Sequence, residues 1–283
     1  MDGADLANLF YSLFTILLLI ASGRLWGTLI QQWRAGQGII EPRFRSLTVR
    51  VPRLAVVLML AYLAMFVSAI VSTSGRQAEL ELTPTTLQAI RMALYTTLLD
   101  GLLAIPFFLG ALLIGYRSRA DLVRLGFRTD HLGEQIREGV RGFLIAVLPV
   151  ALLLVATLPL RSEEVVHPFL RLLREMGIGQ EMLLIFVTAG IIAPLKEELI
   201  FRVILQNWLT EFLPAWLAIG IGAVIFAAIH GFPDSIPLLA LALILGIIFH
   251  YRRSYLTVVV IHFLFNLYNL VATLLPETTP PVV

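Results

Sequence analysis

The sequence predicts an all-α protein, a polytopic transmembrane bundle of about eight helical spans. Two properties of its composition point to this fold: 58% of the 283 residues are apolar and only 14% are charged. An ordinary soluble domain has roughly 45–50% apolar and about 25% charged residues. The third observation is that the apolar residues form long runs, and one helical crossing of a bilayer needs about 20 of them. We therefore expect a multi-pass integral membrane protein without a large domain in water.

Several runs of the chain are apolar enough and long enough to cross a bilayer. Backbone groups inside lipid have no water to bond, so each run must be helical and the helices must pack as one bundle. The first run has no basic start and is too long for a cleaved signal peptide, which favours a first transmembrane helix. The predicted spans are 7–29, 54–72, 95–115, 143–160, 182–209, 213–230, 235–250 and 255–275.

The segments around these spans divide the chain into three predicted parts. Residues 1–140 hold the N-terminal helices and basic interfacial loops, residues 141–275 form a membrane core that carries the polar motifs, and residues 276–283 are a short tail. Within residues 117–142, the stretch LGEQIREGVRG is amphipathic. It either lies along the membrane interface or serves as a solvated connector.

Charge and cysteine content exclude several classes of function. The net charge of +2 is too small to indicate a nucleic-acid partner. The absence of cysteine excludes disulfides, thiolate metal sites and a cysteine nucleophile. Arginines gather in the loops 30–53 and 117–142 and at 252–253, which predicts a cytoplasmic location for these segments and an N-terminus outside. Arginines on the other side oppose this orientation, at positions 161, 171 and 174.

Charged residues are concentrated at one place inside the predicted membrane core, the stretch Pro194–Arg202. Charged groups deep in a bilayer are costly, so such residues are a functional hypothesis by default. On a helix, Glu198 and Arg202 are i,i+4 neighbours and can form an ion pair, which leaves Glu197 on a different side and free to react. The alternative is a salt-bridged helix end at the interface, with Lys196 and Arg202 reaching water.

Two further apolar helices carry polar side chains. Phe226 and His230 close the run GIGAVIFAAIH, and His262 and Asn266 lie within VVVIHFLFNLYNL. On that last helix Asn269 extends a polar stripe down one face. A single buried histidine is commonly a packing residue. Two histidines and an asparagine beside a pair of glutamates favour a reactive site, since burying them for packing alone is costly.

Asp100 lies inside another apolar run, TTLLDGLLAIPFFLGALL. Its neighbourhood Leu-Asp-Gly is found in zinc site-2 proteases, but the His-Glu-x-x-His helix of those enzymes is absent from this sequence. We expect Asp100 to pair with an arginine or to cap a helix break near Pro106, and we leave it out of the site.

This set of side chains permits hydrolysis of a peptide bond without a serine, threonine or cysteine nucleophile. A carboxylate and a histidine can hold and deprotonate a water, while a second histidine and an amide donate hydrogen bonds to an oxyanion. Glu197, His230 and His262 could instead bind a divalent metal such as zinc, which would activate the water. The sequence leaves both alternatives open. It contains no Gly-x-Ser-x-Gly, Gly-x-Gly-Asp or His-Glu-x-x-His motif of other intramembrane hydrolases.

The three motifs, in this order on successive helices, resemble the signature of the CAAX prenyl protease type II family, which also includes bacteriocin-processing and self-immunity proteins. The resemblance covers about residues 140–275. It implies that Glu197 and His230 activate water and that His262 and Asn266 stabilise the oxyanion. It further implies that Glu198 and Arg202 orient the site and that Phe226 shapes the substrate cavity.

The resemblance also implies a context for the enzyme. It predicts an intramembrane endopeptidase in a prokaryotic plasma membrane, acting on a membrane-associated or prenylated protein or peptide. Both a metalloprotease and a metal-free glutamate mechanism are assigned to the family. A non-enzymatic alternative uses the same polar cavity for transport or for binding a bacteriocin-type partner. The clustering of polar residues on three helices, rather than along a path across the bilayer, favours the enzyme.

Overall fold

The computed structural model describes residues 3–38, 50–74, 84–115, 118–160 and 179–274. These residues form helices and no strand, which confirms the predicted all-α class. The predicted tail and the arginines at 161, 171 and 174 lie outside the described residues. The elements are α1 (Gly3–Arg34), α2 (Arg53–Ser74), α3 (Pro84–Gly115), α4 (Arg119–Leu125), α5 (Leu132–Ala156), η1 (Leu158–Leu160), α7 (Gln180–Ile185), η3 (Phe186–Ile192), α8 (Ala193–Glu198), η4 (Leu199–Gln206), α9 (Asn207–Leu209), α10 (Ala215–Ala228), α11 (Ser235–Arg252) and α12 (Tyr255–Leu274).

Five described helices are long and apolar enough to cross a membrane, within α1, α3, α5, α11 and α12. Apolar helices at Arg53–Ala69 and Ala215–Ala228 are shorter. The predicted span 182–209 is a continuous helical run from α7 to α9, interrupted by the π-helices η3 and η4. The count of about eight spans is therefore not confirmed, although helices occupy every predicted span.

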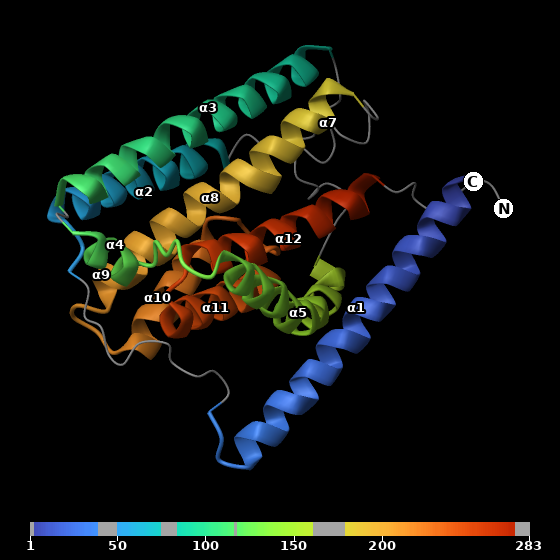
Figure 1. Ribbon diagram of the computed structural model, residues 1–283. Coiled ribbons are helices and arrows are strands. Elements are labelled where there is room, and N and C mark those ends of the chain that lie inside the picture. Colours follow the sequence, from blue (N-terminus) through green and yellow to red (C-terminus); the bar gives the residue numbers. More distant parts are fainter. Residues whose placement is uncertain (1–2, 39–49, 75–83, 116–117, 161–178, 275–283) are drawn as a thin grey trace.

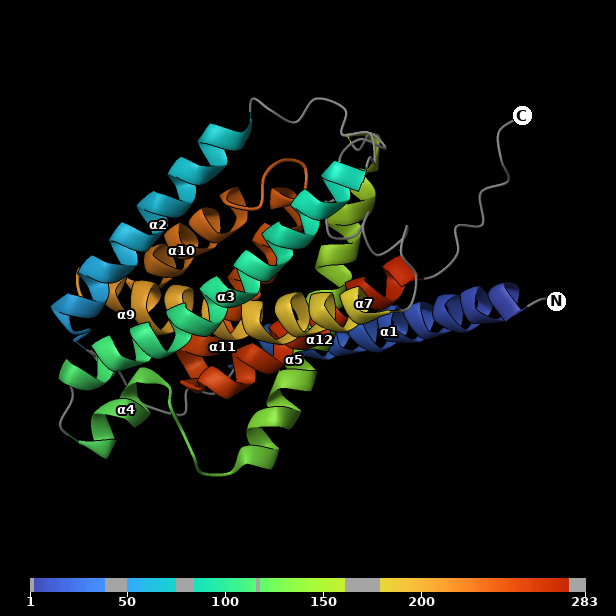
Figure 2. The same cartoon turned by 90° about the horizontal axis from the view of Figure 1, so that it is seen from above.

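The helices form a bundle with α5, α11 and α12 in its middle (Figure 1). The pair α2 and α3 lies on one side and packs against the run from α7 to α9, which in turn packs on α12. On the opposite side α1 runs obliquely across α5 (Figures 1 and 2). The indole N–H of Trp26 donates to the carbonyl of Ile145 at 2.9 Å, and Tyr11 stacks on Tyr268 with ring centroids 5.4 Å apart.

The helix α5 begins at Leu132, eleven residues before the predicted span at 143. The amphipathic stretch is therefore the start of a transmembrane helix rather than a solvated connector, and the predicted domain boundary at residue 140 falls inside α5. The physical reason is close packing: Gln135, Gly139 and Gly142 are buried on one face of this stretch. The division into domains itself stays a prediction.

A buried polar network fixes the start of α12 against α5. The hydroxyl of Ser254 donates to Oε1 of Gln135 at 2.6 Å, and that of Thr257 donates to the backbone carbonyl of Gln135 at 3.0 Å. The backbone N–H of Tyr255 donates to the carbonyl of Gly126 at 2.8 Å. Because buried polar groups stay satisfied only in this arrangement, the network holds the two helices in a defined register.

We expect Gly139→Val to destabilise the protein. A Cβ at position 139 would lie 2.6 Å from Cγ1 of Val260 and 3.1 Å from the carbonyl oxygen of Thr257 in α12, so the helices would have to separate. Overpacking of this kind costs about 1–3 kcal/mol. Gly133→Val, in the same helix, is the control because nothing lies within 4 Å of its Cβ. Thermal unfolding in detergent measures the difference, and equal midpoints for the two variants would contradict the prediction.

Candidate active site

The two glutamates lie on α8, a short α-helix between two π-helices. Pro194 stands in the first turn of α8 and cannot supply a backbone N–H, and η3 ends just before it. The hydroxyl of Tyr255 in α12 donates to the carbonyl of Leu195 at 2.6 Å and ties this segment to the bundle centre. Single π turns inside helices are frequent at functional sites. The next turns, in η4, are wholly buried.

Glu198 is fully buried and has two partners. Arg202, also 0% exposed, donates from Nε to Oε2 of Glu198 at 3.0 Å. Nδ1 of His262 lies 2.8 Å from Oε1 of the same carboxylate. The ion pair expected from the i,i+4 spacing is therefore confirmed, and it is buried rather than interfacial. An isolated buried carboxylate would be very unfavourable, so these two partners stabilise its charge.

Glu197 is the exposed carboxylate of the pair, with a side chain 19% exposed. Its Oε2 lies 3.9 Å from Nε2 of His262, too far for a hydrogen bond. The imidazole of His262 thus lies between the two glutamates: Nδ1 contacts Glu198 and Nε2 faces Glu197. When Nδ1 donates to Glu198, Nε2 is left to interact with a third group beside Glu197.

Phe226 and His230 come from α10 and the turn after it. The Phe226 ring is fully buried and contacts both histidines, with centroids 4.8 Å from His230 and 5.8 Å from His262. The guanidinium carbon of Arg202 lies 5.3 Å from the centre of the same ring. Nδ1 of His230 lies 2.7 Å from the carbonyl oxygen of Phe226. In the part of the chain that the structure describes, no ion pair or hydrogen bond joins His230 to Glu197.

Asn266 lies one turn beyond His262 on α12. Its Nδ2 donates to the carbonyl of Ala189 in the π-helix η3 at 2.8 Å, which uses one of its two amide hydrogens. Asn269, which extends the predicted polar stripe, is exposed and donates to the carbonyl of Phe265 in its own helix. The stripe therefore reaches the site through His262 and Asn266 and not through Asn269.

Lys196 and Asp100 form a further ion pair beside the glutamates. Nζ of Lys196 donates to Oδ2 of Asp100 at 2.8 Å, and the hydroxyl of Tyr62 donates to the same oxygen at 2.6 Å. The predicted partner of Asp100 was an arginine or a helix break near Pro106. Both predictions are wrong: the partner is a lysine, and α3 continues through Pro106. The sequence holds one signal for this pair, since Lys196 is its only lysine and needs an acidic partner when buried.

The metal alternative was tested against the positions of the candidate ligands. Among the described residues, no three His, Cys, Asp or Glu side chains lie close enough to hold a metal ion. Glu197 and His262 come close to each other, whereas His230 contacts Phe226 instead. A catalytic zinc site has three protein ligands, so this arrangement does not fit one, and we derive no step through a metal.

Residues 179–268 match the family model described as Type II CAAX prenyl endopeptidase Rce1-like. The matched region runs from the residue before α7 into α12 and contains every predicted site residue. The resemblance inferred from the three motifs is thereby confirmed. No curated protein and no solved structure matched the chain. The family supports a membrane-embedded protease with a protein substrate.

Proposed function

We propose that this chain, whose region 179–268 is Rce1-like, is an intramembrane endopeptidase that uses Glu197 as the base that activates water. The observation that carries this proposal is the placement of His262 between the two glutamates. Glu198 has its charge stabilised by Arg202 and His262, whereas Glu197 has no such ion pair with an arginine and is partly accessible. One carboxylate is thus structural and the other is free for proton transfer.

The space between Glu197 and His262 suits a water molecule. Polar atoms 3.9 Å apart are too distant to bond directly but can both reach one oxygen. Glu197 would take a proton from this water as its oxygen attacks the carbonyl carbon of the peptide bond. The carbon–nitrogen bond then breaks, and the proton passes from Glu197 to the leaving amine nitrogen. His262, oriented by Glu198, would stabilise the negative oxygen formed in between.

Three other residues have supporting roles in this proposal. The second amide hydrogen of Asn266 would donate to the same oxyanion, since the first is used by Ala189. His230 would assist Glu197 with the water from the far side of the Phe226 ring, through its unused Nε2. Phe226 separates the two histidines and would form the apolar wall of the substrate cavity.

We propose a protein or peptide ending in a CAAX-type sequence as the substrate, and a prokaryotic plasma membrane as the location. The test is release of the C-terminal tripeptide from a prenylated CAAX peptide by protein reconstituted in liposomes. Cleavage that persists with a strong chelator and is lost in Glu197→Gln supports the metal-free mechanism. Loss with chelator overturns it in favour of a metal. No cleavage of prenylated or unprenylated peptide by the wild type overturns the proposed substrate.

We expect Lys196→Met to reduce cleavage more than stability. The ion pair with Asp100 fixes α8 to α3 next to Glu197, and the Asp100 side chain is 41% exposed, so its loss costs little folding energy. Misplacing a reacting group by about 1 Å can cost about 100-fold in rate. Arg91→Met is the matched control because it removes another ion pair from α3, to Glu181 in α7. Equal activities in the two variants would contradict a positioning role for Lys196.

A further inference from the structure

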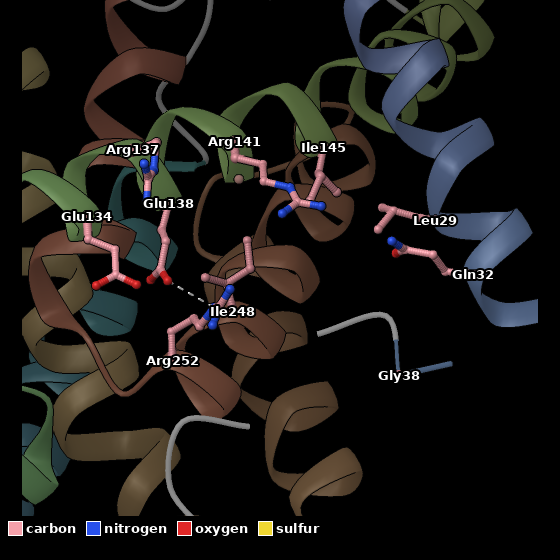
Figure 3. A pocket seen from close by; sticks show the side chains of 11 residues that line it. Leu29, Gln32, Gly38, Glu134, Arg137, Glu138, Arg141, Ile145, Ile248 and Arg252 are labelled. Carbon is pink, nitrogen blue, oxygen red and sulfur yellow. Dashed lines mark ion pairs between the residues drawn. The ribbon is translucent and has the colours of Figure 1, made fainter. Parts of the chain in front are cut away.

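A polar cavity of about 440 Å³ lies away from the active site, between α1, α5 and α11. Figure 3 shows its lining: the guanidinium of Arg141 extends from α5 toward Gln32 of α1, and Glu138 and Arg252 face the cavity from the other side. Leu29, Ile145 and Ile248 supply the apolar part of the wall. The cavity therefore combines charged groups with an apolar surface, which is the chemistry of an amphiphilic ligand.

The cavity lies at one end of the bundle. It is lined by the last turns of α1 and α11 and by the first turns of α5, so three helix ends meet there. The loops next to these ends carry the arginine-rich segments that predict the cytoplasmic face. Basic pockets between transmembrane helices on that face are a known kind of site for lipid headgroups.

The charges in the cavity are mixed rather than uniformly basic. Three arginines and two glutamates line it, and Nε of Arg252 pairs with Oε1 of Glu138 at 3.4 Å. Among the residues that the structure describes, no ion pair or hydrogen bond holds the guanidinium of Arg137 or Arg141. The other oxygen of Glu138, Oε2, is buried and has no hydrogen-bond partner within the same described ranges. The cavity thus offers donors without an anion and one buried acceptor without a donor.

We propose that this cavity binds the headgroup of a phosphatidylethanolamine lipid. The phosphodiester would accept hydrogen bonds from Arg141 and Arg137, since guanidinium groups match phosphate geometry. The ammonium group, one short linker away, would donate to Oε2 of Glu138. The glycerol backbone would lie against Leu29 and Ile145, with the acyl chains leaving into the bilayer between α1 and α5. A zwitterion suits a cavity that carries nearly balanced charges.

The test measures which lipid the purified full-length chain retains, by native mass spectrometry from detergent with equal amounts of phosphatidylethanolamine, phosphatidylcholine and phosphatidylglycerol. Phosphatidylcholine has the same phosphate but no N–H donor. We expect retention of phosphatidylethanolamine to exceed that of phosphatidylcholine by about ten-fold, equivalent to about 1.4 kcal/mol. Equal retention of these two lipids, or a preference for phosphatidylglycerol, overturns the proposal.

Variants of single residues assign the contacts. Arg141→Gln should lose most of the retained phosphatidylethanolamine, and Glu138→Gln should lose the discrimination against phosphatidylcholine. Arg124→Gln is the control, since Arg124 is exposed on α4 and does not line the cavity. Inorganic phosphate alone forms a separate arm: if it raises the unfolding temperature as much as the lipid does, the site is for a free anion and the proposal fails. Unchanged retention in Arg141→Gln also overturns it, and neither result depends on proteolytic activity.

Discussion

Glu197→Gln is expected to reduce peptide cleavage by about 10²–10⁴-fold, the usual contribution of a general base. Glutamine has nearly the same shape as glutamate but cannot accept a proton from water. The side chain makes no close ion pair, its nearest charged partner being Nε2 of His262 at 3.9 Å. The substitution should therefore leave the fold unchanged, and loss of cleavage would report on chemistry alone.

The control for this variant is Glu181→Gln, which alters a glutamate of the same helical run that pairs with Arg91 outside the site. Both variants should insert into membranes and unfold at temperatures close to that of the wild type. Cleavage by Glu197→Gln at the rate of Glu181→Gln would refute the role of Glu197 as the base. Restoration of cleavage by Glu197→Asp, in part, would further support a carboxylate at this position.

The second large effect is expected from Arg202→Met, on stability. Arg202 and Glu198 are both fully buried, and removal of one partner leaves an uncompensated charge in the interior of the bundle. Breaking such a pair typically costs about 3–5 kcal/mol. Nη1 and Nη2 of Arg202 have no partner among the described residues, so the loss arises chiefly at Glu198 rather than at the guanidinium.

The double variant Glu198→Gln/Arg202→Met separates charge from packing. Replacing both members of a buried ion pair is often close to neutral, and glutamine can still accept a hydrogen bond from Nδ1 of His262. The double variant should therefore unfold at a higher temperature than Arg202→Met in the same detergent. If both variants unfold together, the Glu198 charge is not the cause of the instability.

Local patterns predicted the parts of the structure that depend on local geometry. Long apolar runs gave the helices, because lipid leaves the backbone no alternative. The pair Glu198 and Arg202 followed from the spacing along one helix, where i and i+4 side chains are neighbours. The Rce1-like region followed from three motifs in a fixed order. The roles of the individual site residues stay predictions.

Contacts between distant segments could not be predicted in the same way. Asp100 and Lys196 are 96 positions apart, and helical periodicity does not say which helices pack together. The start of α5 at Leu132 depends on the buried face of Gly139 and Gly142 against α12. Which histidine approaches the glutamates depends equally on packing. The structure places His262 there and packs His230 on Phe226.

The π-helices around α8 make the site sensitive to the length of the chain. A π turn holds a longer hydrogen-bonded ring than an α turn, so η3 and η4 shift the angular phase on either side of the two glutamates. Deleting one residue from η3 would keep the helix continuous but rotate everything before it by about 100° relative to α8. Substitutions in these turns change one side chain at a time. A change of one residue in their length would reorient an entire half of the helix.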